Sequence, residues 1–229
     1  MDPDFWHGRW QEKQIGFHQA EPNKLLKIHW PALGLAPASR VFIPLAGKSV
    51  DMVWLAGRGH RIIANELSRI AVEEFFDEQE LTPETRDDGE FTVFTAGPYE
   101  IWCGDIFALP DHVTAGIAAI YDRASLIALP TGMRRRYATK LGGLIHDAAR
   151  SPSPVRNLLI TLEYDQSLID GPPHAVLPDE IDKLFAKDWT IEKIAHEDGA
   201  AVSPKFAAAG IDNVGQTVYL LTSLPGSTA

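Results

Sequence analysis

The sequence contains one cysteine, an excess of acidic over basic residues and no long apolar run. Because Cys103 stands alone, no disulfide can form within the chain, and we expect a protein of the reducing cytoplasm. The 31 acidic and 21 basic residues give a net charge of −10, which disfavours nucleic acid and anionic membranes as partners. No stretch approaches the roughly 20 apolar residues that span a bilayer. We therefore expect neither nucleic acid nor a membrane as a partner.

Several common site motifs are also missing. The sequence has no H-E-x-x-H pattern and no close cysteine–histidine cluster, so it predicts no metal site. The segment "VFIPLAGKS" (41–49) ends like a phosphate-binding P-loop, but Phe42 occupies the position of that motif's first glycine. Pro44 lacks the backbone N–H that phosphate binding requires. Gly47 is the only glycine of the turn, so the dinucleotide pattern G-x-G-x-x-G is absent too, which disfavours an NAD-dependent oxidoreductase.

Short apolar runs alternate with helical patterns along the chain. This alternation predicts an α/β fold, a doubly wound and mostly parallel seven-stranded sheet with helices on both faces. The predicted strands are 40–45, 60–67, 98–107, one within 115–129, 156–164, 189–197 and 217–224, with an extra strand at 91–96 after a polar stretch. The predicted helices are 49–59, 68–79, 131–149 and 179–186. Since no full helix separates the last two strands, we expect one antiparallel strand near the C-terminus.

One acidic residue points to a nucleoside ligand. Glu66 ends the second predicted strand, where doubly wound folds place a carboxylate that accepts hydrogen bonds from ribose hydroxyls. The alternative is a solvated charge at a strand end. Asp105, in "CGDIF" (103–107), ends the third strand, where it could meet an adenine amino group. A ribose site without a phosphate turn favours S-adenosylmethionine over NAD.

Several segments resemble one known family. "FWHGRWQEKQIGFHQAEPNKLLKIHWPAL", "RVFIPLAGKSVDMVWLAGRGH", "IWCGDIF" and "YDRASLIALP" are similar to bacterial thiopurine S-methyltransferases, in order and from about residue 5 to 220. The resemblance implies a Rossmann-like class I methyltransferase, S-adenosylmethionine as donor and a small aromatic thiol as acceptor, and we expect a monomer. The resemblance also implies cofactor contacts at Trp10, Leu45, Glu66 and Arg123, to which we add Gly47, Asp105 and Ile106. It implies that Phe17 and Arg123 lie near the acceptor and that Lys205 stands at the position of a basic residue in relatives, and we add His18 as an acceptor contact.

The N-terminal segment is rich in aromatic residues. We interpret 1–229 as one domain in which residues 1–35 form a cover outside the sheet, and 151–156 as a loop. Trp6 and Trp10 are four positions apart and share a helix face. We interpret Trp6 as packing, and Trp10, Phe17 and His18 as a cover over the pocket. The alternative is that the whole stripe packs the segment onto the sheet.

The sequence shows no obvious catalytic dyad or triad, so we expect catalysis by positioning. Arg123 is the candidate catalytic residue because a fixed cation at a strand end favours an ionised thiol. The alternative is a structural ion pair with a carboxylate near the turn. Residues 134–136, all arginine, are interpreted as a solvated helix face. Two other functions stay open: methylation of selenium or tellurium compounds, and nucleoside binding without catalysis.

Overall fold

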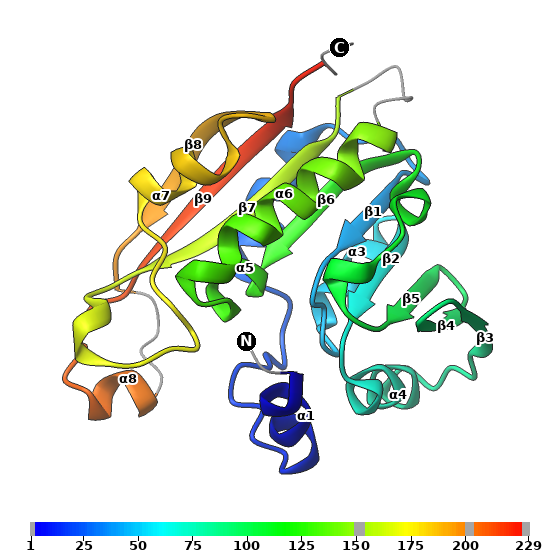
Figure 1. Cartoon of the computed structure of the whole chain (residues 1–229), viewed down its shortest axis with the longest axis horizontal. Helices are drawn as coiled ribbons and strands as arrows, with labels where there is room; N and C mark the ends of the chain where they lie inside the picture. Colours follow the sequence, from blue (N-terminus) through cyan, green and yellow to red (C-terminus); the bar gives the residue numbers. More distant parts are fainter. Residues whose placement is uncertain (1–2, 149–153, 200–203, 226–229) are drawn as a thin grey trace.

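A computed structural model describes residues 3–148, 154–199 and 204–225. In this part of the chain, nine strands form one sheet in the order β3-β4-β5-β2-β1-β6-β7-β9-β8 (Figure 1). The strands are β1 (Arg40–Ile43), β2 (Arg61–Glu66), β3 (Glu84–Asp88), β4 (Phe91–Ala96), β5 (Tyr99–Cys103), β6 (Ile117–Arg123), β7 (Arg156–Glu163), β8 (Trp189–Glu197) and β9 (Gly215–Ser223).

The doubly wound arrangement predicted from the sequence is confirmed. Strands β5, β2, β1, β6 and β7 pair in parallel. Strand β9 lies antiparallel between β7 and β8, as expected for one strand near the C-terminus. Because chain direction reverses only at β9 within these seven strands, the carboxyl ends of the central strands meet at one edge.

The sheet has nine strands, against the seven predicted for the doubly wound core and one predicted as an extra strand. The hairpin β3–β4 extends it antiparallel to β5. The strand at 91–96 was predicted, but "ETRDD" (84–88) lies within a stretch that the sequence indicated only as polar. Its charged side chains suit an edge strand, which is solvated and paired on one side only.

Helices cover both faces of the sheet (Figure 1). On one face α6 (Thr131–Ala148) and α7 (Pro178–Phe185) pack on one apolar core, together with η2 (Ile106–Ala108) and η3 (Asp111–Thr114). On the other face α2 (Lys24–His29), η1 (Trp30–Leu33), α3 (Val50–Gly57) and α4 (Arg69–Glu78) pack on a second core. Strand side chains alternate between the cores: Phe42 faces the first, and Val41 and Ile43 face the second.

The arginine run on α6 is not a uniformly solvated face. Arg134 is buried, donates to the Leu129 carbonyl at 2.9 Å and pairs with Glu180 of α7 at 2.6 Å. Arg135 and Arg136 are exposed. The prediction is therefore wrong for Arg134, because α7 covers that side of α6, which periodicity within α6 cannot reveal.

The N-terminal residues divide into two parts. Four apolar side chains of α2 and η1 are buried in the second core: Leu25, Leu26, Trp30 and Leu33. The preceding helix α1 (Pro3–Gln11) lies beyond the carboxyl ends of the central strands, between α4 and α8 (Pro204–Ala208) in the view of Figure 1. Since α2 and η1 belong to the core, a cover outside the sheet stays a prediction for residues 3–20 only.

The connecting segments add two short helices, α5 (Ser125–Ala128) and η4 (Gln166–Leu168). Of the loop predicted at 151–156, residues 151–153 lie outside the described residues, and the last residue, Arg156, begins β7. Within the described ranges, no helix combines the length and apolarity of a membrane span.

Candidate functional site

The candidate site lies at the carboxyl edge of the sheet, where ligands bind in doubly wound folds. The turn after β1 supplies Leu45 and Gly47, and β2 and β6 end at Glu66 and Arg123. Asp105 and Ile106 follow β5. Residues that are far apart in the sequence therefore reach one edge from four neighbouring strands (Figure 1).

The glycine turn binds a carboxylate of its own chain. The Gly47 N–H donates to Glu66 Oε2 at 2.8 Å, and the Ser68 N–H donates to Oε1 at 2.7 Å. Burial raises the pKa of Glu66, whereas these backbone donors act to lower it. The N–H that a P-loop would direct at phosphate is thus committed to Glu66, which agrees with the prediction that the turn does not bind a triphosphate.

Aromatic side chains lie against this turn. Trp10 is buried, and a Cβ atom placed on Gly47 would lie 3.2 Å from Trp10 Cζ2. Gly47 also has φ +54°, so both the backbone and the close ring favour glycine here. Phe17 contacts Trp10 and Trp6 edge-on at centroid distances of 5.7 and 5.6 Å. Since Phe17 keeps 42% of its surface exposed, it belongs to the rim of this cluster.

His18 is half-buried beside several charged groups. Burial lowers its pKa from 6.5, and the positive charges of Lys48 and Arg123 lower it further. Glu78 and Glu74 act in the opposite direction. The ring is therefore mainly neutral at pH 7, and it brings the N-terminal segment close to Arg123.

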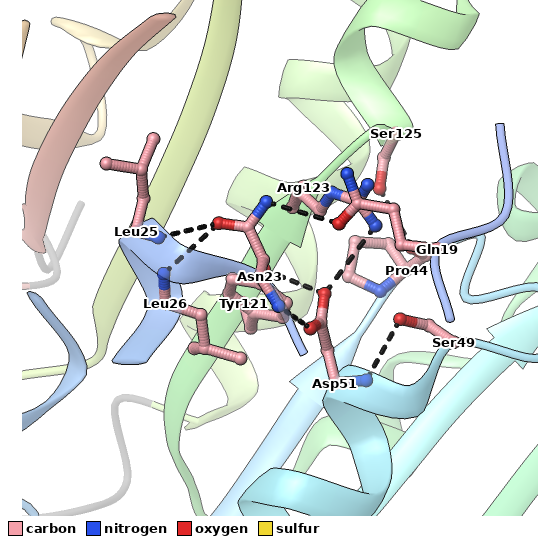
Figure 2. Close-up of polar contacts among 10 residues, drawn as sticks. All are labelled: Gln19, Asn23, Leu25, Leu26, Pro44, Ser49, Asp51, Tyr121, Arg123 and Ser125. Atoms are coloured by element: carbon pink, nitrogen blue, oxygen red, sulfur yellow. Dashed lines mark hydrogen bonds and ion pairs between the residues drawn. The ribbon is translucent and has the colours of Figure 1, made fainter. Parts of the chain in front are cut away.

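Arg123 lies beside a buried carboxylate that the sequence analysis did not identify (Figure 2). Its Nη1 atom is 3.6 Å from Asp51 Oδ2, while Asp51 is only 1% exposed. Tyr121 donates its hydroxyl to Oδ2 at 2.9 Å, and the Asn23 N–H donates to Oδ1 at 2.7 Å. The ion pair considered as the alternative role of Arg123 is thus present, but 3.6 Å is too long for a hydrogen bond.

The residues after β5 are held by Asn65. Its Nδ2 donates to the carbonyls of Trp102 and Gly104 at 3.0 and 2.9 Å. Asp105 is exposed, and its Oδ1 accepts the Phe107 N–H at 3.0 Å, so this carboxylate caps η2. The Ile106 side chain is buried in the first core, and any contact from it to a cofactor must come from its backbone.

Lys205 lies on α8, away from the strand ends that hold Glu66 and Arg123. Its Nζ donates to the carbonyls of Asp170 and Pro172 at 3.2 and 2.8 Å. Burial lowers the pKa of Lys205, and the positive charge of Arg9 on α1 lowers it further.

Two further charged groups were missed by the sequence analysis. Lys48 Nζ binds Glu74 at 2.7 Å and Glu78 at 2.6 Å, with only 9% of its side chain exposed. The two glutamates are four residues apart on a predicted helix, a spacing that could have suggested a shared partner. Asp122 is fully buried, and burial raises its pKa to about 6 although the Tyr137 hydroxyl donates to it at 2.7 Å.

The described residues offer positioning rather than nucleophilic chemistry. Burial, and secondarily Glu66, raises the pKa of Cys103 to about 11, which keeps this thiol protonated and unreactive. Within the described ranges, no group of three histidine, cysteine or acidic residues could hold a metal ion. A carboxylate, a guanidinium and an aromatic cluster are thus the functional groups gathered at this edge.

Comparison with known proteins gives concordant matches. The family model described as thiopurine S-methyltransferase matches residues 1–224. Two similar proteins, both named thiopurine S-methyltransferase, come from Pseudomonas putida and Pseudomonas entomophila. The first is 48% identical, covering 96% of this chain and 98% of the relative. The second is 47% identical, covering 97% and 100%.

Solved structures match at the level of the fold. An S-adenosylmethionine-dependent methyltransferase from Anabaena variabilis has a TM-score of 0.63 at 15% identity, covering 97% of this chain and 95% of that protein. A Burkholderia thailandensis 1,6-didemethyltoxoflavin-N1-methyltransferase, with bound 1,6-didemethyltoxoflavin and S-adenosylhomocysteine, also has a TM-score of 0.63, at 13% identity and covering 96% and 86%. The predicted class I methyltransferase fold is thereby confirmed.

Proposed function

This chain belongs to the thiopurine S-methyltransferase family, and we propose that it methylates the sulfur of thiopurines or related aromatic and heterocyclic thiols. It is an S-adenosylmethionine-dependent methyltransferase with a small-molecule acceptor. The observation that carries the proposed acceptor is Arg123, a cation at the end of β6 that makes no close hydrogen bond to its buried partner Asp51. Its guanidinium is therefore available to an ionised thiol.

The residues at the strand ends fit a nucleoside donor without phosphates. Glu66 is held in place by backbone N–H groups, and each carboxylate oxygen has a second acceptor position for a ribose hydroxyl. Trp10 supplies an apolar wall beside Gly47. When bound, S-adenosylmethionine supplies a methyl group on a positively charged sulfonium sulfur. The group that leaves is then a neutral thioether, which is an excellent leaving group. The chain's own task is then to orient the two ligands.

The acceptor side supports the same division of work. A heterocyclic thiol ionises readily, so a strong general base is not required. Arg123 stabilises the thiolate form, and its planar fork can also contact a ring nitrogen. Phe17 offers an exposed aromatic face, and His18 a mainly neutral ring beside Arg123. Holding the acceptor sulfur in line with the methyl group lowers the barrier by several kcal/mol.

Residues 3–20 are proposed to form a cover over this site. The aromatic cluster lies against the donor turn through Trp10, and the positive charge of Arg123 acts on His18. A cover that excludes water strengthens the electrostatic effect of Arg123 on a bound thiolate. We also propose that Lys205 on α8 contacts an acceptor, although its Nζ donates to the Asp170 and Pro172 carbonyls in this structure.

A single assay tests the proposal. The protein is incubated with S-adenosylmethionine and a thiopurine, a benzenethiol, an aliphatic thiol or an aromatic selenol, and methylated products are identified by mass spectrometry. We expect S-methylation of the thiopurine and the benzenethiol. Product from the selenol alone would instead support selenium methylation. Binding of S-adenosylhomocysteine by calorimetry without any product would support nucleoside binding without catalysis.

A further inference from the structure

The buried carboxylate of Asp51 joins three elements that are distant in the sequence (Figure 2). Asp51 lies in the first turn of α3, behind the capping residue Ser49. Its partners are Asn23 at the start of α2, and Tyr121 and Arg123 on β6. A carboxylate that is 1% exposed is costly to bury unless its charge is compensated, so this set of partners is a built feature.

The two carboxylate oxygens have different partners. Oδ1 accepts the Asn23 N–H at 2.7 Å, and Oδ2 accepts the Tyr121 hydroxyl at 2.9 Å. These bonds fix the plane of the carboxylate. The Arg123 guanidinium then faces Oδ2 at 3.6 Å, which gives charge compensation without the paired hydrogen bonds of a fork-to-fork contact.

We propose that Asp51 is a positioning residue for Arg123, and that the Asn23 N–H makes this positioning depend on the docking of α2. The inference rests on the proposed function, in which Arg123 contacts the acceptor. Asp51 holds the guanidinium at the site without occupying its fork of donors. When Asn23 moves away, Oδ1 loses its donor, the carboxylate turns towards Arg123, and a bidentate pair withdraws the fork from the acceptor.

The charges around Arg123 make Asp51 the group that decides its position. Lys48 and Arg123 both lower the pKa of His18, so each of these two cations acts on the His18 ring. Lys48 itself is compensated by Glu74 and Glu78. Within the described part of the chain, Asp51 is the one carboxylate within 4.0 Å of Arg123.

The competing explanation is purely structural, because Asp51 also ties α2 to the sheet. A matched control separates the two roles. The Asn23 side chain caps α2, because its own Oδ1 accepts the Leu25 and Leu26 N–H groups. Asn23→Ala removes this cap, but it leaves the backbone N–H of residue 23 that donates to Asp51. This variant loses stability at the same place while the Asp51–Arg123 geometry stays intact.

The experiment compares Asp51→Asn, Tyr121→Phe and Asn23→Ala with the wild type. The first readout is the ¹⁵N-arginine side-chain NMR spectrum, in which the Arg123 signal is assigned from its loss in Arg123→Lys. The second is kcat/KM for a thiopurine, and the third is the affinity for S-adenosylhomocysteine. Tyr121→Phe is the second test, for the case that Asp51→Asn fails to fold. It removes the hydroxyl that donates to Asp51 Oδ2 and leaves the negative charge of Asp51 in place.

We expect the Arg123 signal to shift in Asp51→Asn and Tyr121→Phe and to stay in place in Asn23→Ala. Asp51→Asn should lower kcat/KM by about tenfold, and its effect should vanish in an Arg123→Lys background, as for residues that act through a direct contact. An unshifted Arg123 signal, or fully additive losses, would overturn the inference. The NMR comparison needs no turnover, so an inactive wild type would refute the proposed function and leave this test intact.

Discussion

The ends of β2 and β6 hold their charged groups in different ways. At the end of β2, Glu66 is fixed by the backbone N–H groups of Gly47 and Ser68. At the end of β6, Arg123 is fixed only by side chains, through Asp51 at 3.6 Å. Backbone donors belong to a turn and cannot rotate away, whereas side chains can. The proposed donor half of the site is thus held more rigidly than the proposed acceptor half.

The two buried acids at these ends sharpen the contrast. Burial raises the pKa of both Glu66 and Asp122. Glu66 accepts hydrogen bonds on both oxygens, but Asp122 accepts the Tyr137 hydroxyl on Oδ2 while its Oδ1 has no hydrogen-bond partner among the described residues. Ionisation is thus disfavoured at both ends, and the two acids differ in the donors that oppose this effect: backbone N–H groups for Glu66, and the Tyr137 hydroxyl first for Asp122.

Removing the rigid carboxylate should produce the largest effect. In the proposed site Glu66 accepts two charge-assisted hydrogen bonds from the ribose, so Glu66→Ala should weaken S-adenosylhomocysteine binding by about 4 kcal/mol. Isothermal calorimetry measures this loss. Glu73→Ala is the control, because Glu73 pairs with Arg69 on the exposed side of α4. Equal affinity in wild type and Glu66→Ala would remove Glu66 from the donor site.

Asp122, the buried acid at the end of β6, should make the stability of the fold depend on pH. The pKa of Asp122 is about 6 in the folded protein against 3.8 ordinarily, so the folded state keeps the proton longer. The raised pKa of Asp122 adds to the free energy of unfolding in full below pH 3.8. This addition, about 3 kcal/mol, is lost as the pH rises through 6. Asp122→Asn lacks this titration. The free energy of unfolding of both proteins is measured by urea unfolding at several pH values. As the pH rises, the value for the wild type should fall relative to that of Asp122→Asn by about 3 kcal/mol. A difference that stays constant with pH would contradict the prediction.

Replacing the adjustable cation tests the acceptor half. Arg123→Lys keeps the charge but loses the planar fork. It should cost about 2 kcal/mol of transition-state stabilisation, which lowers kcat/KM roughly 30-fold. Arg123→Met loses the charge as well and should shift the acidic limb of the rate profile to higher pH. The measurement is kcat/KM against pH with one thiopurine. Three superimposable profiles at equal thermal stability would exclude Arg123 from acceptor chemistry.

The cover over both halves should give the smallest effect. If residues 3–20 close over the ligands, this segment can open only after the ligands are released. Exchange of the amide hydrogens of residues 3–20 should therefore slow when the ligands bind. With ligand at ten times its Kd, the slowing is about tenfold, or about 1.4 kcal/mol. Hydrogen exchange with S-adenosylhomocysteine and a thiopurine measures it, with β3 as an internal control. Unchanged exchange in α1 would make its aromatic residues structural packing only.

The sequence predicted the architecture well because periodicity is a local property. Alternating apolar runs located the central strands and helices, and Ser49 caps α3 as predicted, accepting the Asp51 N–H at 3.2 Å. The absence of a second glycine, together with Pro44, excluded a P-loop without knowledge of the fold. The polar edge strand β3 escaped this reasoning because it has no apolar face.

The local pattern of strands and turns is enough to place Glu66 and Arg123 at the carboxyl ends of strands. What those two residues contact depends on how the elements pack in three dimensions. Asp51 meets Asn23 and Arg123, and Lys48 meets two glutamates of α4, across long separations in the chain. Such pairs depend on which helix covers which strand end. Burial then fixes their energetics, because a buried charge is stable only where the fold supplies a partner.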